Sequence, residues 1–444
     1  MKKAKIYYAR MDELWRKEQK LECLENLKTI DDVDWQEIEP DKNNTWLTEG
    51  LEDDFEGFIA LGGKETKAAK AVVKNCIFKV YSLGISTSRD AWVYNFTTKE
   101  LLVNIQLMAN TYNEELTRWQ KINKSINIDN FVIYDDTKIS WSNILKRYLE
   151  RNIFLKFNPI FVRPSIYRPF TISYIYFDAY FSDTFSKFPL IFPTTKTEGQ
   201  NTVILVPGVG NRKDFGCFIS KFIIARDFAF EKVQVFSFYI YDKDGTNRQE
   251  NITDWALKEF RDHYQDATIS KWDIFYYTYA VLHHPHYRDR YAANLKRELP
   301  RIPFAPEFHG FSIAGKRLAE IHINYEQQPE YRLKHIENKD LPIDWRVEKM
   351  RLSKDKTQIK YNDFLTLTGI PSEAIEYRLG NRSALDWIID QYQVSTDKRS
   401  GITNDPNRLD DEEYIVRLIK QVITVSLETV KIVKSLPDLG LPKN

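Results

Sequence analysis

The segment Asp386–Leu436 constrains the fold of this chain more than any other part of the sequence. Two strongly patterned apolar segments enclose a polar loop, Thr396–Asn404, that is rich in Lys, Arg, Ser, Gly and Asn. The second apolar segment, Glu412–Ser435, has an acidic first turn and is followed by Pro437, which predicts a helix despite its many Val, Ile and Thr residues. A basic polar loop between rigid elements is well placed to contact a polar partner.

Composition limits the class of protein. The 444 residues provide for two or three domains, and 43% hydrophobic with 29% charged residues is typical of a globular chain. The net charge is only +1, so any nucleic-acid contact must depend on local basic patches. The three cysteines are far apart, no apolar run approaches ~20 residues, and the N-terminus lacks a signal-peptide core. We therefore expect a reduced, cytoplasmic protein without a membrane partner.

The patterning predicts an α+β fold with mixed sheets and a helical C-terminal portion. We expect three regions: residues 1–60, residues 61–330 and the mainly helical residues 331–444. A helix should begin near Thr98, with Thr97 or Thr98 as its cap and Glu100 in its first turn. The opening strand-like Ile6–Tyr8 has no evident strand partner. Further expected elements are strands at Ala91–Tyr94, Ile153–Lys156 and Val203–Val206 and helices at Ser372–Leu379 and Ser383–Tyr392.

One tetrapeptide invites a catalytic interpretation. Asn158–Phe161 reads N-P-I-F, close to the N/D-P-P-Y/F loop with which amino-methyltransferases hold a flipped base. However, the second proline is missing, and the Gly-containing turn after Val203–Val206 is not followed by a helix pattern. No acidic residue ends a neighbouring strand at the spacing that holds a ribose. We predict no catalytic residue in this chain.

The histidine group His283, His284 and His286 suggests a metal site only superficially. No carboxylate or cysteine lies at a partner spacing on the same element. We expect two of the three to bond to helix C-terminal carbonyls or to face solvent, and we predict no metal ligand.

A set of polar, basic loops is more promising for binding. Arg and Lys pair with guanine acceptors, Asn pairs with adenine, and hydroxyls and amides hold phosphates. Each loop taken alone could equally be a solvated surface, and Arg168 could be a buried ion-pair residue. As candidate DNA contacts we select Arg89, Tyr167, Arg168, Arg212, Lys213, Asn247, Arg248, Lys398, Arg399 and Asn404.

Long, idiosyncratic strings carry a family resemblance through nearly the whole chain. They include W-Q-E-I-E-P-D-K at 35–42, S-R-D-A-W-V-Y-N at 88–95, D-G-T-N-R-Q-E-N-I-T-D-W-A-L at 244–257, W-D-I-F-Y-Y-T-Y-A-V-L-H-H-P-H-Y-R at 272–288 and R-V-E-K-M-R-L-S-K-D-K at 346–356. With these strings and the Asp386–Leu436 segment, the chain resembles the C-terminal target-recognition region of type ISP restriction–modification enzymes.

The resemblance implies a DNA sequence-specificity module for phage defence, with residues 61–330 as target-recognition region and residues 1–60 as the tail of an adenine methyltransferase domain. Duplex DNA is the expected partner, together with methyltransferase, motor and nuclease domains upstream or on a split partner subunit. No cofactor is expected in this chain, and S-adenosylmethionine is expected on the methyltransferase core. Two alternatives remain open: an adenine-N6 methyltransferase that uses Asn158 and Phe161, and an assembly protein without DNA contact.

Overall fold

The computed structural model describes residues 4–12, 15–41, 44–67, 75–122 and 126–442, and the chain forms two compact units, residues 1–53 and 54–444. In the first unit, β1 (Ile6–Tyr8) pairs antiparallel with β2 (Gln36–Ile38), and α1 (Lys17–Asn26) and η1 (Ile30–Asp32) lie between them in sequence. The expectation of an unpartnered opening strand is therefore wrong. The partner was missed because Gln36–Ile38 belongs to an acidic, polar stretch without an alternating apolar pattern.

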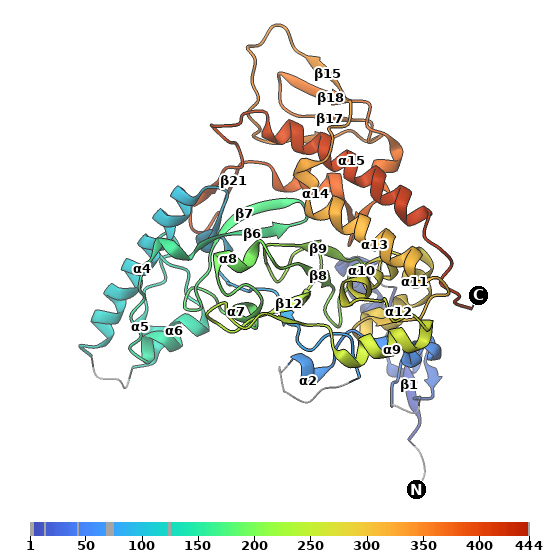
Figure 1. Cartoon of the computed structure of the whole chain (residues 1–444). Coiled ribbons are helices and arrows are strands. Elements are labelled where there is room, and N and C mark those ends of the chain that lie inside the picture. The colour runs from blue at the N-terminus through green and yellow to red at the C-terminus, as the bar shows by residue number, and fades with distance from the viewer. Residues whose placement is uncertain (1–3, 13–14, 42–43, 68–74, 123–125, 443–444) are drawn as a thin grey trace. The chain divides into compact units, whose positions relative to one another are not determined.

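Two four-stranded sheets organise the second unit (Figure 1). The mixed sheet has the order β10-β6-β7-β5, and the antiparallel sheet has the order β4-β11-β8-β9. Their bounds are β4 Ser82–Leu83, β5 Tyr94–Asn95, β6 Val162–Arg168, β7 Thr171–Tyr176, β8 Val203–Val206, β9 Phe218–Ser220, β10 Ile223–Ile224 and β11 Gln234–Ser237.

Strand β8 is confirmed at its predicted bounds and lies between two hydrophobic cores. Val203 and Leu205 belong to one core, while Ile204 and Val206 belong to another. Alternate residues of a strand point to opposite faces, so all four side chains are buried only if both faces are covered. A continuous apolar run without polar alternation is the sequence pattern that such burial produces.

A third core lies under α4 (Thr98–Trp119) and α6 (Asn143–Glu150). The predicted cap of α4 is confirmed, because the Thr97 hydroxyl accepts a hydrogen bond from the Glu100 amide at 3.3 Å. Elsewhere α10 (Lys271–Val281) packs closely on α13 (Phe308–Ile323). A Cβ atom at Gly315 would lie 1.9 Å from the Tyr276 carbonyl oxygen, so glycine permits this approach.

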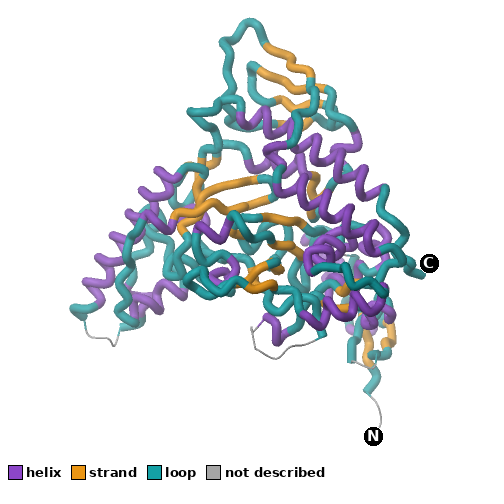
Figure 2. Tube along the Cα trace, in the orientation of Figure 1, coloured by secondary structure: helices purple, strands orange, loops and turns teal. Residues whose placement is uncertain are grey.

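The C-terminal part combines two helices with a separate antiparallel sheet of order β15-β18-β17-β16, visible as orange strands beside purple helices (Figure 2). The bounds are α14 Ala384–Gln391, α15 Tyr414–Lys434, β15 Lys334–Glu337, β16 Arg351–Leu352, β17 Gln358–Lys360 and β18 Leu365–Thr368. The α+β class is thus confirmed, with α14 and α15 in its helical C-terminal portion. None of the helices in the described ranges has the length and apolar character to cross a membrane.

Three local expectations are wrong. Residues 90–93 form a helical turn, α3 (Asp90–Val93), before β5. The segment 153–156 is no strand, because its backbone bonds to side chains of α4: the Leu155 amide donates to Asn113 Oδ1 at 3.0 Å, and Tyr112 donates to the Ile153 carbonyl at 2.9 Å. The helix expected at 372–379 is a short η5 (Ser372–Ile375) followed by strand β19 (Arg378–Leu379).

The remaining elements are short or peripheral. They are η2 Asp53–Gly57, β3 Ile59–Ala60, α2 Lys64–Lys67, α5 Ile128–Phe131, η3 Pro159–Phe161, α7 Phe188–Ile191, α8 Thr195–Glu198, β12 Tyr239–Ile240, β13 Gln249–Glu250, α9 Asp254–Tyr264, α11 Pro285–Arg290, α12 Ala292–Arg297, β14 Arg301–Ile302, η4 Tyr325–Gln327, β19 Arg378–Leu379, β20 Arg382–Ser383, β21 Ser395–Thr396 and β22 Thr403–Asn404.

Candidate nucleic-acid interface

A cleft of about 350 Å³ lies between the mixed sheet and the segment from α14 to β22. We call it the polar cleft. It brings together two of the predicted residues, Tyr167 and Asn404, which are 237 positions apart in the sequence. Its lining residues are Asp90, Ala91, Tyr94, Phe96, Tyr167, Ser173, Asp390, Gln391, Gln393, Ser395, Thr396, Asp397, Ile402 and Asn404.

The lining of the polar cleft suits the edges of bases. Amides come from Gln391, Gln393 and Asn404, carboxylates come from the three aspartates, and no Lys or Arg is among the lining residues. Carboxamides pair with adenine, and carboxylates accept from the amino group of cytosine. The Ser173 hydroxyl in the wall is buried and has no hydrogen-bond partner among the described residues. Buried hydroxyls are normally paired, so Ser173 is an exception in the wall of the cleft.

Tyr167 is fixed inside the polar cleft. Its hydroxyl donates to Asp90 Oδ2 at 2.9 Å, and its ring centroid lies 4.7 Å from that of Tyr94. Burial and the neighbouring Asp90 raise the pKa of Tyr167, so the hydroxyl stays protonated. The group therefore presents a neutral polar tip on an apolar ring.

The predicted loop 396–404 is the turn of a hairpin formed by β21 and β22. Asp397 Oδ1 accepts from the Ser400 amide at 2.8 Å and from the Ser400 hydroxyl at 2.9 Å, and Gly401 takes a φ of +74°. Asn404 Oδ1 accepts from the Phe96 amide at 3.1 Å, which ties the hairpin to the chain beside β5. These bonds hold the loop in one conformation and fix it to the mixed sheet.

Two exposed cations project from this hairpin. Lys398 is exposed, and Arg399 makes a two-point ion pair with Asp136, with nitrogen–oxygen distances of 3.0 and 3.0 Å. Side chains that stand at the edge of a cleft can reach phosphates on either side of bound bases.

Arg89 does not fit the role predicted for it. Its guanidinium is buried and donates to the Phe181 carbonyl at 2.9 Å, to Ser142 Oγ at 2.5 Å and to Asp183 Oδ1 at 2.9 Å. These bonds leave no free face for DNA, so the structure assigns Arg89 to holding α3 against the segment before α6. This role was not predicted because the partners of Arg89 lie 53 to 94 positions further along the chain.

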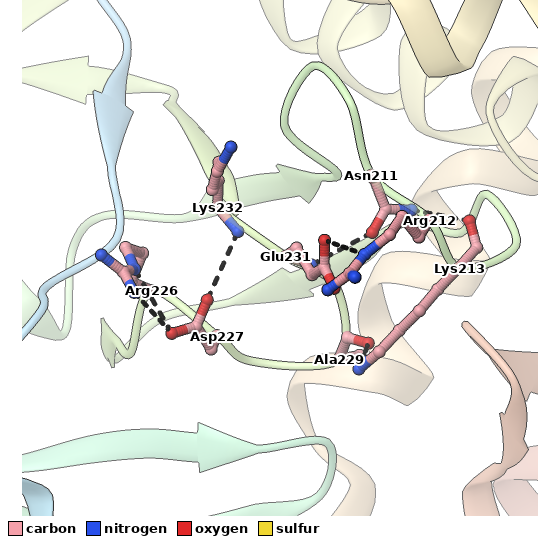
Figure 3. Close-up of polar contacts among 8 residues, drawn as sticks. All are labelled: Asn211, Arg212, Lys213, Arg226, Asp227, Ala229, Glu231 and Lys232. Atoms are coloured by element: carbon pink, nitrogen blue, oxygen red, sulfur yellow. Dashed lines mark hydrogen bonds and ion pairs between the residues drawn. The ribbon is translucent and has the colours of Figure 1, made fainter. Parts of the chain in front are cut away.

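Arg168, Arg212 and Lys213 are also engaged within the chain. The Arg168 guanidinium lies 3.9 Å from the centroid of the Tyr167 ring and is partly buried. Figure 3 shows Arg212 directed at Glu231, at 2.7 Å, and Lys213 directed at the Ala229 carbonyl, at 3.1 Å. Arg212 is largely exposed in this pair, whereas Lys213 is half-buried and lines a different cavity.

Asn247 and Arg248 lie in the turn between β12 and β13, apart from the β21 hairpin (Figure 1). Asn247 has a φ of +51°, and the Arg248 guanidinium lies 4.7 Å from the Tyr239 ring centroid. The structure does not bring this pair to the polar cleft. Their contact with DNA stays a prediction.

The side chains of the tetrapeptide Asn158–Phe161, the basis of the methyltransferase alternative, make local structural contacts. Asn158 Oδ1 accepts from the Ile160 amide at 3.1 Å as the cap of η3, and the Phe161 ring packs edge-on against Tyr176.

His283 is buried and bonds to the Tyr279 carbonyl in the last turn of α10, at 2.9 Å. Within the described ranges, no group of three or more His, Cys, Asp or Glu is placed to hold a metal ion.

Sequence reasoning missed a basic face on the sheet β15–β18. The register places Lys334 opposite Thr368 and Gln358, and it places Ile336 opposite Thr366, Lys360 and Arg351. Residues opposite one another share a face, so the strands of this face carry three cations, Lys334, Arg351 and Lys360, and Lys360 pairs with Asp363 at 2.8 Å. The other face carries His335, Leu367, Ile359 and Leu352. The polar–apolar–polar alternation of Gln358, Ile359 and Lys360 was the available sequence signal for this face, but the strands are too short for the pattern to be recognised.

The chain has an α+β scaffold that places an amide-rich cleft beside a basic hairpin, an arrangement that fits a specificity module. The chain belongs to the family of the Type ISP C-terminal specificity domain, whose family model matches residues 76–419. The match includes the polar cleft and its hairpin. No curated protein matches the chain.

Solved structures support the same assignment. The chain is similar to a nuclease-deletion mutant of the Type ISP restriction–modification enzyme LlaGI in complex with a DNA substrate mimic, with 33% identity, a TM-score of 0.85, and coverage of 99% of this chain and 40% of that one. The chain is also similar to a DrdV–DNA complex, with 32% identity, a TM-score of 0.85, and coverage of 98% of this chain and 44% of that one. The ATP-dependent Type ISP enzyme LlaBIII bound to DNA is 28% identical, with a TM-score of 0.86, and the match covers 99% of this chain and 28% of that one. The chain thus spans less than half of each of these proteins.

Proposed function

We propose that this chain is the DNA sequence-specificity module of a restriction–modification system and recognises a short duplex site for an adenine methyltransferase and nuclease located outside it. The polar cleft carries this proposal: base-reading amides line it, and Lys398 and Arg399 stand at its edge within a Type ISP specificity domain. Bases would be read in the cleft and phosphates would be held by the hairpin. We further propose that it acts in the cytoplasm, where target DNA lies.

The test is fluorescence anisotropy on a pool of random duplexes at low salt, with and without a partner protein that carries the methyltransferase core. We expect binding, followed by enrichment of one short sequence on repeated selection. Absence of binding under both conditions contradicts the proposal. Calorimetry with S-adenosylmethionine on the chain alone should give no heat of binding, because we propose that this cofactor binds the methyltransferase core.

The hairpin separates DNA binding from a pure assembly role. The double variant Lys398→Ala/Arg399→Ala should weaken binding to all sequences alike and make the dependence of log K on log salt shallower by about 1 to 2 units. The matched control is Lys258→Ala on α9, which removes an exposed cation far along the chain. Unchanged DNA affinity in the hairpin variant would support assembly through a protein partner instead.

A further inference from the structure

A second cavity, distinct from the polar cleft, lies between the loop before β9, helices α11 and α12, and the end of α15. It has a volume of about 500 Å³, within the ~300–1,000 Å³ range of small-molecule sites. We call it the α11–α15 cavity. Of the residues selected from the sequence, His283 and Lys213 line this cavity, and neither of them lines the polar cleft.

Cations outnumber carboxylates in the lining of the α11–α15 cavity. It holds five cations and the three carboxylates Asp214, Asp289 and Glu376, and Glu376 pairs with Lys434 at 2.8 Å. Among the described residues, Arg288 and Lys296 line the cavity without an ion pair to a carboxylate. Lys213 lines it as well, and burial, with Arg168 and Arg382 nearby, lowers the pKa of Lys213. Cations that lack carboxylate partners at the mouth of a cavity attract an anion.

The lining includes the buried His283, whose Nδ1 lies 3.3 Å from Sγ of the buried Cys217. Burial, with Arg288 and His322 nearby, lowers the pKa of His283 far below its usual value, and burial raises the pKa of Cys217 to about 11. His283 and Cys217 are therefore neutral near pH 7 and do not neutralise an anion. Arg288 Nη2 donates to Cys217 Sγ at 3.6 Å, and this hydrogen bond orients the guanidinium.

Tyr377 supplies a second, independent indication of a ligand. It lines the cavity, its side chain is 5% exposed, and its hydroxyl has no hydrogen-bond partner among the described residues. Its ring is held parallel to His322 at a centroid distance of 5.2 Å. A buried hydroxyl without a partner costs stability unless a ligand completes its bonding.

Apolar side chains share the lining with these cations. They are Phe215, Leu295, Val430 and Val433, and the Arg288 guanidinium lies 5.9 Å from the centroid of the Phe215 ring. A ligand that contacts both the cations and the apolar side chains joins a flat apolar ring to an anionic group. We propose that the α11–α15 cavity binds a nucleoside phosphate, with the phosphate at Arg288 and Lys296, the base against Phe215, and a hydrogen bond to the Tyr377 hydroxyl. This site goes beyond DNA recognition, and it does not depend on the polar cleft.

The test is isothermal titration calorimetry of the whole chain, without DNA, against AMP, adenosine and inorganic phosphate. AMP should bind saturably at least 10-fold more tightly than either part, because only AMP contacts both the cations and the apolar side chains of the lining. No saturable heat with AMP up to 1 mM, or equal affinity for AMP and inorganic phosphate, overturns the proposal, the latter because the cavity then holds an adventitious ion only.

Tyr377→Phe provides the sharpest variant. It should weaken AMP binding about 2- to 10-fold, the worth of one hydrogen bond, and leave the thermal midpoint equal or higher because an unpaired buried hydroxyl is removed. Tyr241→Phe is the matched control: its hydroxyl is also buried without a partner, but it does not line the cavity. Equal AMP affinity for both variants and the unmodified chain overturns the assigned contact. Arg288→Gln should reduce AMP binding at least 10-fold and leave duplex DNA binding unchanged.

Discussion

Arg89 and Arg399 show how the same side chain takes opposite roles in one chain. Arg89 is 3% exposed and donates to four oxygen partners, whereas the side chain of Arg399 is 72% exposed and pairs with one carboxylate. Removing Arg89 would leave several buried acceptors unpaired, which is strongly destabilising. Arg399 contributes little to folding because exposed ion pairs are weak. Only the second arginine is available for a partner.

Gln393 offers a residue-level test of base reading. Its amide lines the polar cleft and donates to the Asp390 carbonyl at 2.8 Å. We expect Gln393→Ala to relax the preference at one base pair, by about 1–3 kcal/mol, while the salt dependence stays unchanged. Binding to a panel of single-base variants of the selected site measures this effect. A uniform loss across the panel would show that Gln393 acts on structure and not on base choice.

His322 gives a pH-dependent prediction. Its Nδ1 accepts from the Tyr279 hydroxyl at 2.6 Å and its Nε2 donates to Thr429 at 2.8 Å, and burial, with Arg288 nearby, lowers its pKa to about 3. The unfolded chain binds a proton near pH 6.5 and the folded chain does not. The stabilisation from this histidine is therefore complete above pH 6.5 and is lost as the pH falls from 6.5 toward 3, by about 1.4 kcal/mol per pH unit.

Urea unfolding at pH 7.5, 6.0 and 5.0 measures this dependence. The variant His322→Asn has no such group, so its free energy of unfolding should fall less steeply with decreasing pH. Identical slopes for the two proteins would mean that the buried imidazole does protonate in the folded chain.

At the level of elements, the basic face of sheet β15–β18 predicts a second phosphate contact. The triple variant Lys334→Ala/Arg351→Ala/Lys360→Ala should lower affinity for all duplexes alike and reduce the salt slope by up to about 2.7 units. Anisotropy titrations between 50 and 200 mM salt measure both quantities. Removing exposed cations on α9 and α13, in Lys258→Ala/Lys316→Ala/Arg317→Ala, is the control, and an equal effect there would indicate only general charge attraction.

The close approach of α10 and α13 is a second element-level prediction. Gly315→Ala should destabilise the chain by about 1–3 kcal/mol or more, because the new methyl group must push Tyr276 and the two helices apart. Gly199→Ala is the matched control, since its Cβ would meet open space and its φ is −65°. Urea midpoints compare the two, and equal stability of both variants would contradict the packing argument.

The elements predicted best are those whose determinants are local. The α4 helix has its cap and apolar stripe within its own residues, and β8 has an uninterrupted apolar run. The segment 153–156 was mistaken because its partners are side chains of α4, and 372–379 because the β19–β20 hairpin interrupts it. The polar cleft was predicted in part: Tyr167 and Asn404 were selected, but nothing local shows that Gln391, Gln393 and Ser173 join them.

At the level of the whole molecule, the boundary after Asp53 predicts independent folding. Residues 54–444 form one compact unit that contains all three hydrophobic cores. A chain of residues 54–444 should therefore unfold cooperatively, with a urea midpoint close to that of the full chain, and keep its affinity for duplex DNA. Circular dichroism and anisotropy measure these properties, and a molten 54–444 chain would show that residues 1–53 are required for folding.

The ion pair between Arg399 and Asp136 has a consequence for the search along DNA. In the proposed complex, a phosphate that makes a two-point contact with Nε and Nη2 of Arg399 must displace a carboxylate of the same protein, so this contact exchanges one anion for another. Such an exchange gains little on random sequence, where no base contact holds the hairpin in register. The protein would then dissociate quickly from non-target sites and bind tightly only at its target. Asp136 would thus act as an internal competitor that raises sequence specificity at the expense of affinity.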